Sequence, residues 1–75
     1  AEGMGDISLY PNPTSDQINL GNLEINKNIE VCDVEGRIVR TLLPSSAIIA
    51  HDVSDLAAGT YMVKQGGRIC RFNKL

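Results

Sequence analysis

Few side chains in this 75-residue chain have the types and spacing that catalysis needs. His51 is the only histidine, so a Cys–His or Ser–His pair would have to use it from within an alternating, strand-like segment. A lone histidine in such a segment more commonly packs within or beside a sheet. Because no nucleophile, base and orienting group can be assembled, the sequence indicates a protein that is not an enzyme.

Two pairs of carboxylates lie in segments rich in turn-forming residues: Asp33 with Glu35, and Asp52 with Asp55. Neither pair has the spacing of a calcium loop or the histidine and cysteine neighbours of a zinc site. Aspartate side chains in turns commonly accept hydrogen bonds from nearby backbone N–H groups. We therefore expect both pairs to stabilise turns, and we expect no metal and no cofactor.

The two cysteines, Cys32 and Cys70, could be joined by a disulfide in an oxidising compartment. Such a bond would close a long loop and stabilise the domain by ~3 kcal/mol or more. Cys32, however, alternates out of phase with the apolar residues Ile29 and Val31, which predicts that its thiol faces away from the core. Two free or intermolecular thiols are therefore the alternative to the disulfide.

Charges are separated along the chain, whose formal net charge is −2. Acids dominate residues 1–35, whereas residues 56–75 contain no acid and four bases: Lys64, Arg68, Arg71 and Lys74. Either an acidic early strand lies beside a basic late one, or the basic C-terminal end is a recognition element. The acidic balance argues against binding to nucleic acid or to a membrane surface.

Short apolar–polar alternations separated by Gly, Pro, Asn, Asp and Ser run through the whole sequence, and no stretch has a sustained helical period. They predict strands near residues 7–9, 18–20, 29–32, 37–42, 47–53, 60–64 and 68–72. About seven short strands, with turns roughly every 8–12 residues, are typical of an all-β, immunoglobulin-like antiparallel β-sandwich. The length is that of one domain.

The segment LYPNPTS places Pro11 and Pro13 on either side of Asn12, directly after the first alternation. Proline lacks an N–H group and biases the preceding residue toward extended geometry, so neither a helix nor a central strand can continue here. We expect an extended crossover between the first two strands.

Two further segments have the composition of specific turns. Asp33 and Gly36 suit a hairpin turn closed by a left-handed residue. Leu56, Gly59 and Tyr61 stand where immunoglobulin-like sandwiches place a tyrosine whose hydroxyl bonds back to the backbone just upstream. Glycine at that corner would permit a positive φ, so we interpret Tyr61 as structural.

Four blocks, LYPNPTSDQINL, IEVCDVEGRIV, HDVSDLAAGTYMVK and RICRFNKL, follow one another in this order and cover essentially the whole chain. Together they resemble the C-terminal sorting domain of the type IX secretion system, the Por secretion system tail family. Cys32 and His51 depart from the family pattern, since apolar residues are frequent at both positions. The positions that match its motifs are Tyr10, Pro11, Asn12, Pro13, Asp33, Gly36, Arg37, Asp52, Val53, Ser54, Leu56, Gly59, Tyr61, Phe72 and Lys74.

The resemblance implies a seven-stranded sandwich at the C-terminal end of a cargo protein, which it directs from the periplasm through an outer-membrane translocon. It also implies that a sortase-like peptidase removes the domain, leaving the cargo attached to surface lipopolysaccharide or released. Residues 1–6 would be the linker near the cleavage site and residues 7–75 the sorting domain. Edge strands could also support self-association.

Within this resemblance, we hypothesise that the terminal strand is recognised through Arg68, Arg71, Phe72 and Lys74. We expect the charges of Arg71 and Lys74 to be reversible without loss of the fold, because changes of exposed charge usually have small effects on stability. The alternative function is a non-catalytic immunoglobulin-like spacer or a carbohydrate-binding module on a surface protein. A module of the latter kind usually needs exposed aromatic rings for stacking, and the chain has three aromatic residues.

Overall fold

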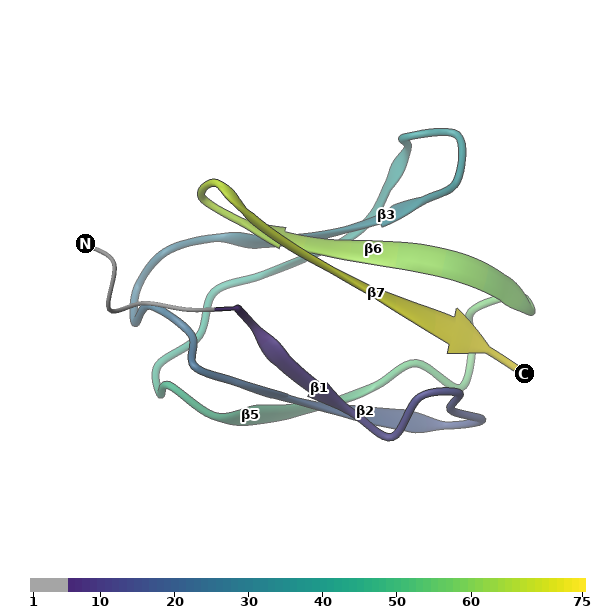
Figure 1. Ribbon diagram of the computed structural model, residues 1–75, viewed down its shortest axis with the longest axis horizontal. Helices are drawn as coiled ribbons and strands as arrows, with labels where there is room; N and C mark the ends of the chain where they lie inside the picture. The colour runs from purple at the N-terminus through teal and green to yellow at the C-terminus, as the bar shows by residue number, and fades with distance from the viewer. Residues whose placement is uncertain (1–5) are drawn as a thin grey trace.

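The computed structural model describes residues 6–75, which form two β-sheets packed face to face (Figure 1). One sheet has the strand order β1-β2-β5 and the other the order β4-β3-β6-β7, with antiparallel pairing throughout. The part of the chain described has no helix that could span a membrane. This architecture confirms the predicted all-β sandwich, and its strands are β1 (Ser8–Tyr10), β2 (Gln17–Gly21), β3 (Ile29–Asp33), β4 (Ile38–Leu42), β5 (Ile49–Asp52), β6 (Gly59–Gln65) and β7 (Arg68–Lys74).

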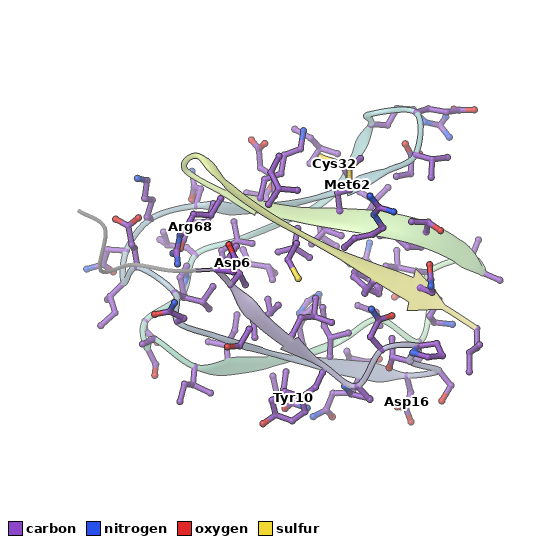
Figure 2. All side chains as sticks on the ribbon, in the orientation of Figure 1. Asp6, Tyr10, Asp16, Cys32, Met62 and Arg68 are labelled. Carbon is purple, nitrogen blue, oxygen red and sulfur yellow. The ribbon has the colours of Figure 1, made fainter. Side chains whose placement is uncertain are left out.

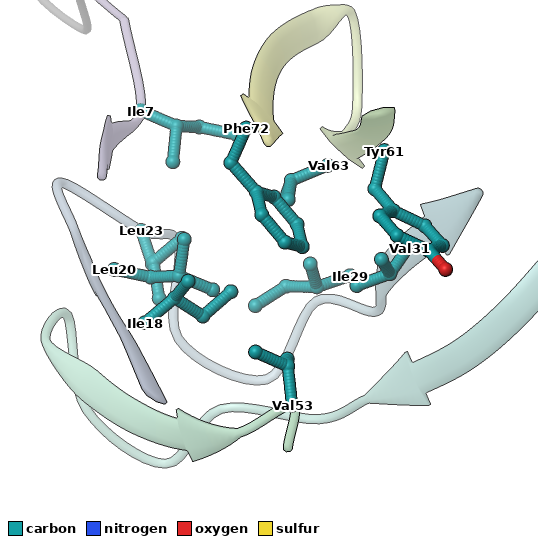
Figure 3. Close-up of a cluster of buried hydrophobic side chains, with 10 residues drawn as sticks. All are labelled: Ile7, Ile18, Leu20, Leu23, Ile29, Val31, Val53, Tyr61, Val63 and Phe72. Atoms are coloured by element: carbon teal, nitrogen blue, oxygen red, sulfur yellow. The ribbon is translucent and has the colours of Figure 1, made fainter. Parts of the chain in front are cut away.

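Alternate residues of the strands point between the sheets and form one apolar core (Figure 3). The chain is poor in aromatic residues, so most of this core is aliphatic; the rings of Tyr61 and Phe72 stack with their centroids 5.5 Å apart. Each large side chain removed from water in this way contributes about 1.5–3 kcal/mol to folding. The core residues are Ile7, Ile18, Leu20, Leu23, Ile29, Val31, Val53, Tyr61, Val63 and Phe72.

The corner before β6 has the predicted tyrosine arrangement. The Tyr61 hydroxyl donates a hydrogen bond to the carbonyl oxygen of Ala57 at 2.6 Å. Gly59 has a φ of +151°, and a Cβ atom there would meet nothing within 4 Å. The requirement for glycine therefore comes from backbone conformation and not from lack of space. Leu56 packs partly against the core, which holds the corner on the sandwich.

The hairpin between β3 and β4 also forms as predicted. Asp33 Oδ1 accepts hydrogen bonds from the backbone N–H groups of Glu35 at 2.9 Å and Arg37 at 3.0 Å. Gly36 has a φ of +85°, in the left-handed region expected at the end of this turn. The Arg37 guanidinium returns to Asp33 Oδ2 at 3.0 Å, so one carboxylate organises the whole turn.

The segment with the two prolines differs from the prediction. β1 and β2 are adjacent antiparallel strands, with Leu9 opposite Leu20, so residues 11–16 connect a hairpin and are not a crossover. Both peptide bonds that precede Pro11 and Pro13 are cis. The connection reaches the second sheet, where Thr14 forms a parallel bridge with Lys74 of β7.

The two cysteines are free thiols on opposite faces of the four-stranded sheet. Cys32 lies opposite Met62 on the outer face (Figure 2), and Cys70 lies opposite the core residue Val63 on the inner face. Cys32 thus faces away from the core as predicted, although neighbouring side chains leave it only 2% exposed. Because a disulfide needs side chains that point toward each other, this arrangement favours the free-thiol alternative.

Replacement of Gly59 by alanine tests the backbone requirement at the corner. We expect Gly59→Ala to lower the free energy of unfolding by roughly 1–3 kcal/mol, because a side chain is strained at this φ. Chemical denaturation measures the change. Gly67→Ala is the control, since an added Cβ is also unobstructed there and no left-handed φ is required. Equal midpoints for the two variants would contradict our account of the corner.

Candidate functional site

β7 lies at an edge of the four-stranded sheet, where a strand normally leaves one row of backbone N–H and C=O groups unpaired. Here residues of the proline segment cover the C-terminal half of that edge. The Thr14 N–H donates to the Asn73 carbonyl at 2.9 Å, and the Leu75 N–H donates to the Thr14 carbonyl at 2.8 Å. The buried Thr14 hydroxyl donates to the Gln17 carbonyl at 2.6 Å, which fixes Thr14 in turn.

The side chain of Asn12 continues this pairing along β7. Its Nδ2 donates to the Arg71 carbonyl at 3.3 Å, and its Oδ1 accepts from the Asn73 N–H at 2.9 Å. A carboxamide has both a donor and an acceptor, so Asn12 substitutes for the peptide group of a neighbouring strand. We call the contacts of Asn12 and Thr14 with β7 the terminal clamp.

The clamp joins the first and the last motifs of the sequence into one structure. The sequence identified Asn12 as a motif residue but did not predict its contact with β7, which lies some sixty residues away along the chain. One signal was present: the two flanking prolines lack N–H groups, so a side-chain amide is needed to supply a donor there.

Side chains of β7 point alternately to the two faces of the sheet, so the four hypothesised recognition residues do not all lie on the same face. Phe72 is a core residue that stacks on Tyr61, and Lys74, which has the same parity, is only 9% exposed. The Lys74 ammonium donates to the Leu75 carbonyl at 3.0 Å. The expectation that Lys74 is an exposed charge is therefore wrong, and Lys74→Glu would place a carboxylate on the inward face of the strand.

Arg68 is half-buried and ties the last hairpin to the loop after β2. Its Nη1 donates to the Asn22 carbonyl at 2.7 Å and its Nη2 to Gln65 Oε1 at 2.8 Å. Gln65 is itself buried. Its Oε1 atom accepts a hydrogen bond from the Glu24 N–H, and its Nε2 atom donates to the carbonyl oxygens of Glu24 and Lys27. The strand predicted near residues 60–64 ended before Gln65, although Gln65 has the same parity as Tyr61 and Val63, which could have revealed its inward position.

Arg71 is the hypothesised recognition residue whose charge is presented to solvent. It lies on the outer face of β7 and forms no ion pair with any residue in the range 6–75. The bases of the first part of the chain are all paired: Lys27 with Glu24, Arg37 with Asp33 and Glu35, and Arg40 with Asp55. Within the described residues, Arg71 thus differs from these bases in having no ion-pair partner.

Asp33, Glu35 and Asp52 have the local roles expected of them, whereas Asp55 forms an ion pair with Arg40 of β4 and, among the residues described, does not bond within its own turn. Hydrogen bonds from Arg37 hold the pKa of Asp33 below its usual value, and those from Ser54 lower the pKa of Asp52. Asp52 and Ser54 also line a shallow depression of about 390 Å³ with Asp16 and Gln17. The residues from Asp6 onward contain no group of three side chains that could hold a metal ion.

His51 packs on the inner face of β5, opposite the core residue Ile18, which agrees with a packing role. Its Nε2 atom is buried and has no hydrogen-bond partner among the residues described. A buried polar atom of this kind weakens a fold unless something compensates for it. An apolar residue at position 51 would avoid that cost.

The sequence matches the family described as "Secretion system C-terminal sorting domain" over residues 8–68, which is most of the chain. The fold is similar to a solved chain from a study of PorZ, an essential bacterial surface component of the type-IX secretion system of Porphyromonas gingivalis, with a TM-score of 0.71. The identity is 18%, and the similarity covers 92% of this chain but 11% of that chain, so it shows the fold alone. No curated protein sequence matches this chain.

Removal of the Asn12 side chain tests the terminal clamp. We expect Asn12→Ala to lower the free energy of unfolding by about 1–2 kcal/mol, because it removes two hydrogen bonds to the backbone of β7. Hydrogen exchange should accelerate at the Asn73 amide and stay unchanged at Val63. Asn19→Ala is the control, because the Asn19 amide bonds Tyr10 and makes no contact with the clamp. Unchanged exchange at Asn73 would contradict the clamp.

The lowered pKa of Asp33 predicts a specific dependence of stability on pH. The ionised carboxylate stabilises the fold at pH values above the ordinary aspartate pKa of about 3.9, and this contribution is lost as the pH falls through the lowered folded-state pKa. We therefore expect Asp33→Asn to melt at a lower temperature than the wild type at pH 6, with the difference shrinking toward pH 2. Asn12→Ala removes uncharged contacts, so its deficit should not change with pH. A constant deficit for Asp33→Asn would refute the role of ionisation.

Proposed function

The chain belongs to the family of secretion system C-terminal sorting domains, and from this membership we propose that it directs an attached cargo protein through the outer-membrane translocon of a type IX secretion system. The observation that carries the proposal is the family match over residues 8–68, on a chain whose predicted motifs fold into one sandwich. The domain itself has no catalytic role in this proposal. Its cargo passes through the periplasm and ends on the cell surface or in the medium.

Cleavage by a sortase-like peptidase is the second part of the proposal. Ile7 is a core residue, and the Asp6 carbonyl accepts a hydrogen bond from Asn22 Nδ2 at 2.9 Å. These contacts support a cleavage site on the N-terminal side of Asp6, where the cut would leave the sandwich intact. The expected linker, residues 1–6, thus lies mostly outside the described residues.

The positions of the aromatic rings support sorting over carbohydrate binding. Tyr61 and Phe72 are core residues, whereas Tyr10 is 60% exposed. Recognition of a sugar by stacking would therefore depend on the single ring of Tyr10. A spacer needs no binding surface, so that role would not account for the exposed charge of Arg71, which forms no ion pair within residues 6–75.

A reporter fusion tests the proposed function. Residues 1–75 are fused behind a signal peptide and a reporter, in a host with a type IX secretion system and in the same host without it. We expect the reporter on the surface or in the medium of the first host and in the periplasm of the second. The same reporter without residues 1–75 should stay periplasmic in both. Periplasmic retention of the fusion in the competent host would refute the proposal.

A further inference from the structure

The outer face of the four-stranded sheet has a composition unusual for a surface in water. One row of laterally paired residues crosses all four strands, from Ile38 of β4 through Cys32 and Met62 to Arg71 of β7; Figure 2 labels the two central residues, Cys32 and Met62. The next row places Lys64 beside Ile69. We call these six residues the outer sheet face.

Apolar side chains occupy positions where a solvated sheet normally has polar ones. An antiparallel sheet with one face in water usually alternates between apolar residues inside and polar residues outside. Ile38 is nevertheless 54% exposed and Ile69 58% exposed, while Cys32 and Met62 lie between them. Cys32 itself is buried, so the apolar side chains exposed in full or in part are those of Ile38, Met62 and Ile69. Exposed apolar groups bordered by polar ones are typical of interaction sites in soluble proteins.

The same face carries two cations without carboxylate partners. Neither Lys64 nor Arg71 forms an ion pair with any of residues 6–75, although Glu30 lies directly opposite Lys64. In a chain with a net charge of −2, this face therefore carries two cations against the single carboxylate of Glu30, beside exposed apolar side chains.

The outer face of the other sheet differs in charge. Tyr10, Asn19 and Ala50 form one of its rows, and Gln17 lies opposite Asp52 in another. These positions carry a carboxylate but no cation. The combination of apolar and cationic groups is thus a property of one face and not of the whole surface.

We propose that the outer sheet face is the docking surface for a protein partner whose own surface is apolar and bordered by carboxylates. Burial of Ile38, Met62 and Ile69 would supply affinity, and Lys64 and Arg71 would guide and orient the complex. Docking of a second copy through the same face would bring like charges together, which opposes self-association there. The inference rests on the proposed function, in which this partner belongs to the secretion machinery.

Two double variants of the reporter fusion test the apolar and the charged parts of the face separately: Ile38→Ser with Ile69→Ser, and Lys64→Gln with Arg71→Gln, which removes both charges without placing a carboxylate opposite Glu30. We expect each to reduce the exported reporter by about tenfold, because a few buried residues dominate the affinity of an interface. The unfolding midpoint of each purified domain should stay close to that of the wild type, since all four side chains lie on the outer face. Ile48→Ser is the matched control, because Ile48 is 68% exposed and belongs to the other sheet's side.

Crosslinking identifies the partner of this face directly. A photoreactive residue at position 69 should form a crosslink with a protein of the secretion machinery, and one at position 48 should not. Crosslinks from position 69 to a second copy or to lipid would overturn the proposal. Normal export of both folded double variants would also overturn it, while leaving the proposed sorting function intact. Failure of the unmodified fusion to be exported would instead refute the sorting function.

Discussion

The pairing of the proline segment with the edge of β7 is the constraint on which the rest of this surface depends. A seven-residue strand at a sheet edge would otherwise expose a row of backbone groups and could fray or pair with another chain. Asn12 and Thr14 pair with that row over its last residues, from Arg71 to Leu75. The C-terminal end of the chain is therefore ordered by its beginning, and the outward direction of Arg71 follows from this order.

Once β7 is held in place, the alternation of its side chains between the two faces of the sheet decides which of them a partner can contact. Phe72 supplies core packing, Lys74 is buried at the end of the strand, and Arg68 bonds inward to the backbone and to Gln65. Arg71 and Ile69 point the other way, toward solvent. Of the three bases in β7, two therefore lie on the inward face of the strand, and Arg71 alone remains exposed to solvent.

Local patterns predicted most of the fold because they act between near neighbours. Asp33 with Gly36 specified a turn, and Tyr61 with Gly59 specified a corner, within a few residues of sequence. The terminal clamp could not be predicted in this way, since nothing local shows which distant strand will receive the Asn12 amide. The exposure of Lys74 was predicted wrongly because charge was given more weight than the parity shared with Phe72.

Most of the motif residues stabilise the fold, so few of their side chains are available to contact a partner. Asp33, Gly59 and Tyr61 stabilise turns and a corner, and Asn12 closes a sheet edge, so the motif specifies a sandwich and not a linear sequence to be read. A machine that sorts cargo by this domain must then contact side chains that the sandwich presents together. Residues distant in sequence, such as Ile38 and Arg71, meet that condition only in the folded state, because the rows of the four-stranded sheet align them. If the outer sheet face is the docking surface as proposed, sorting would select for a folded domain as well as for its sequence.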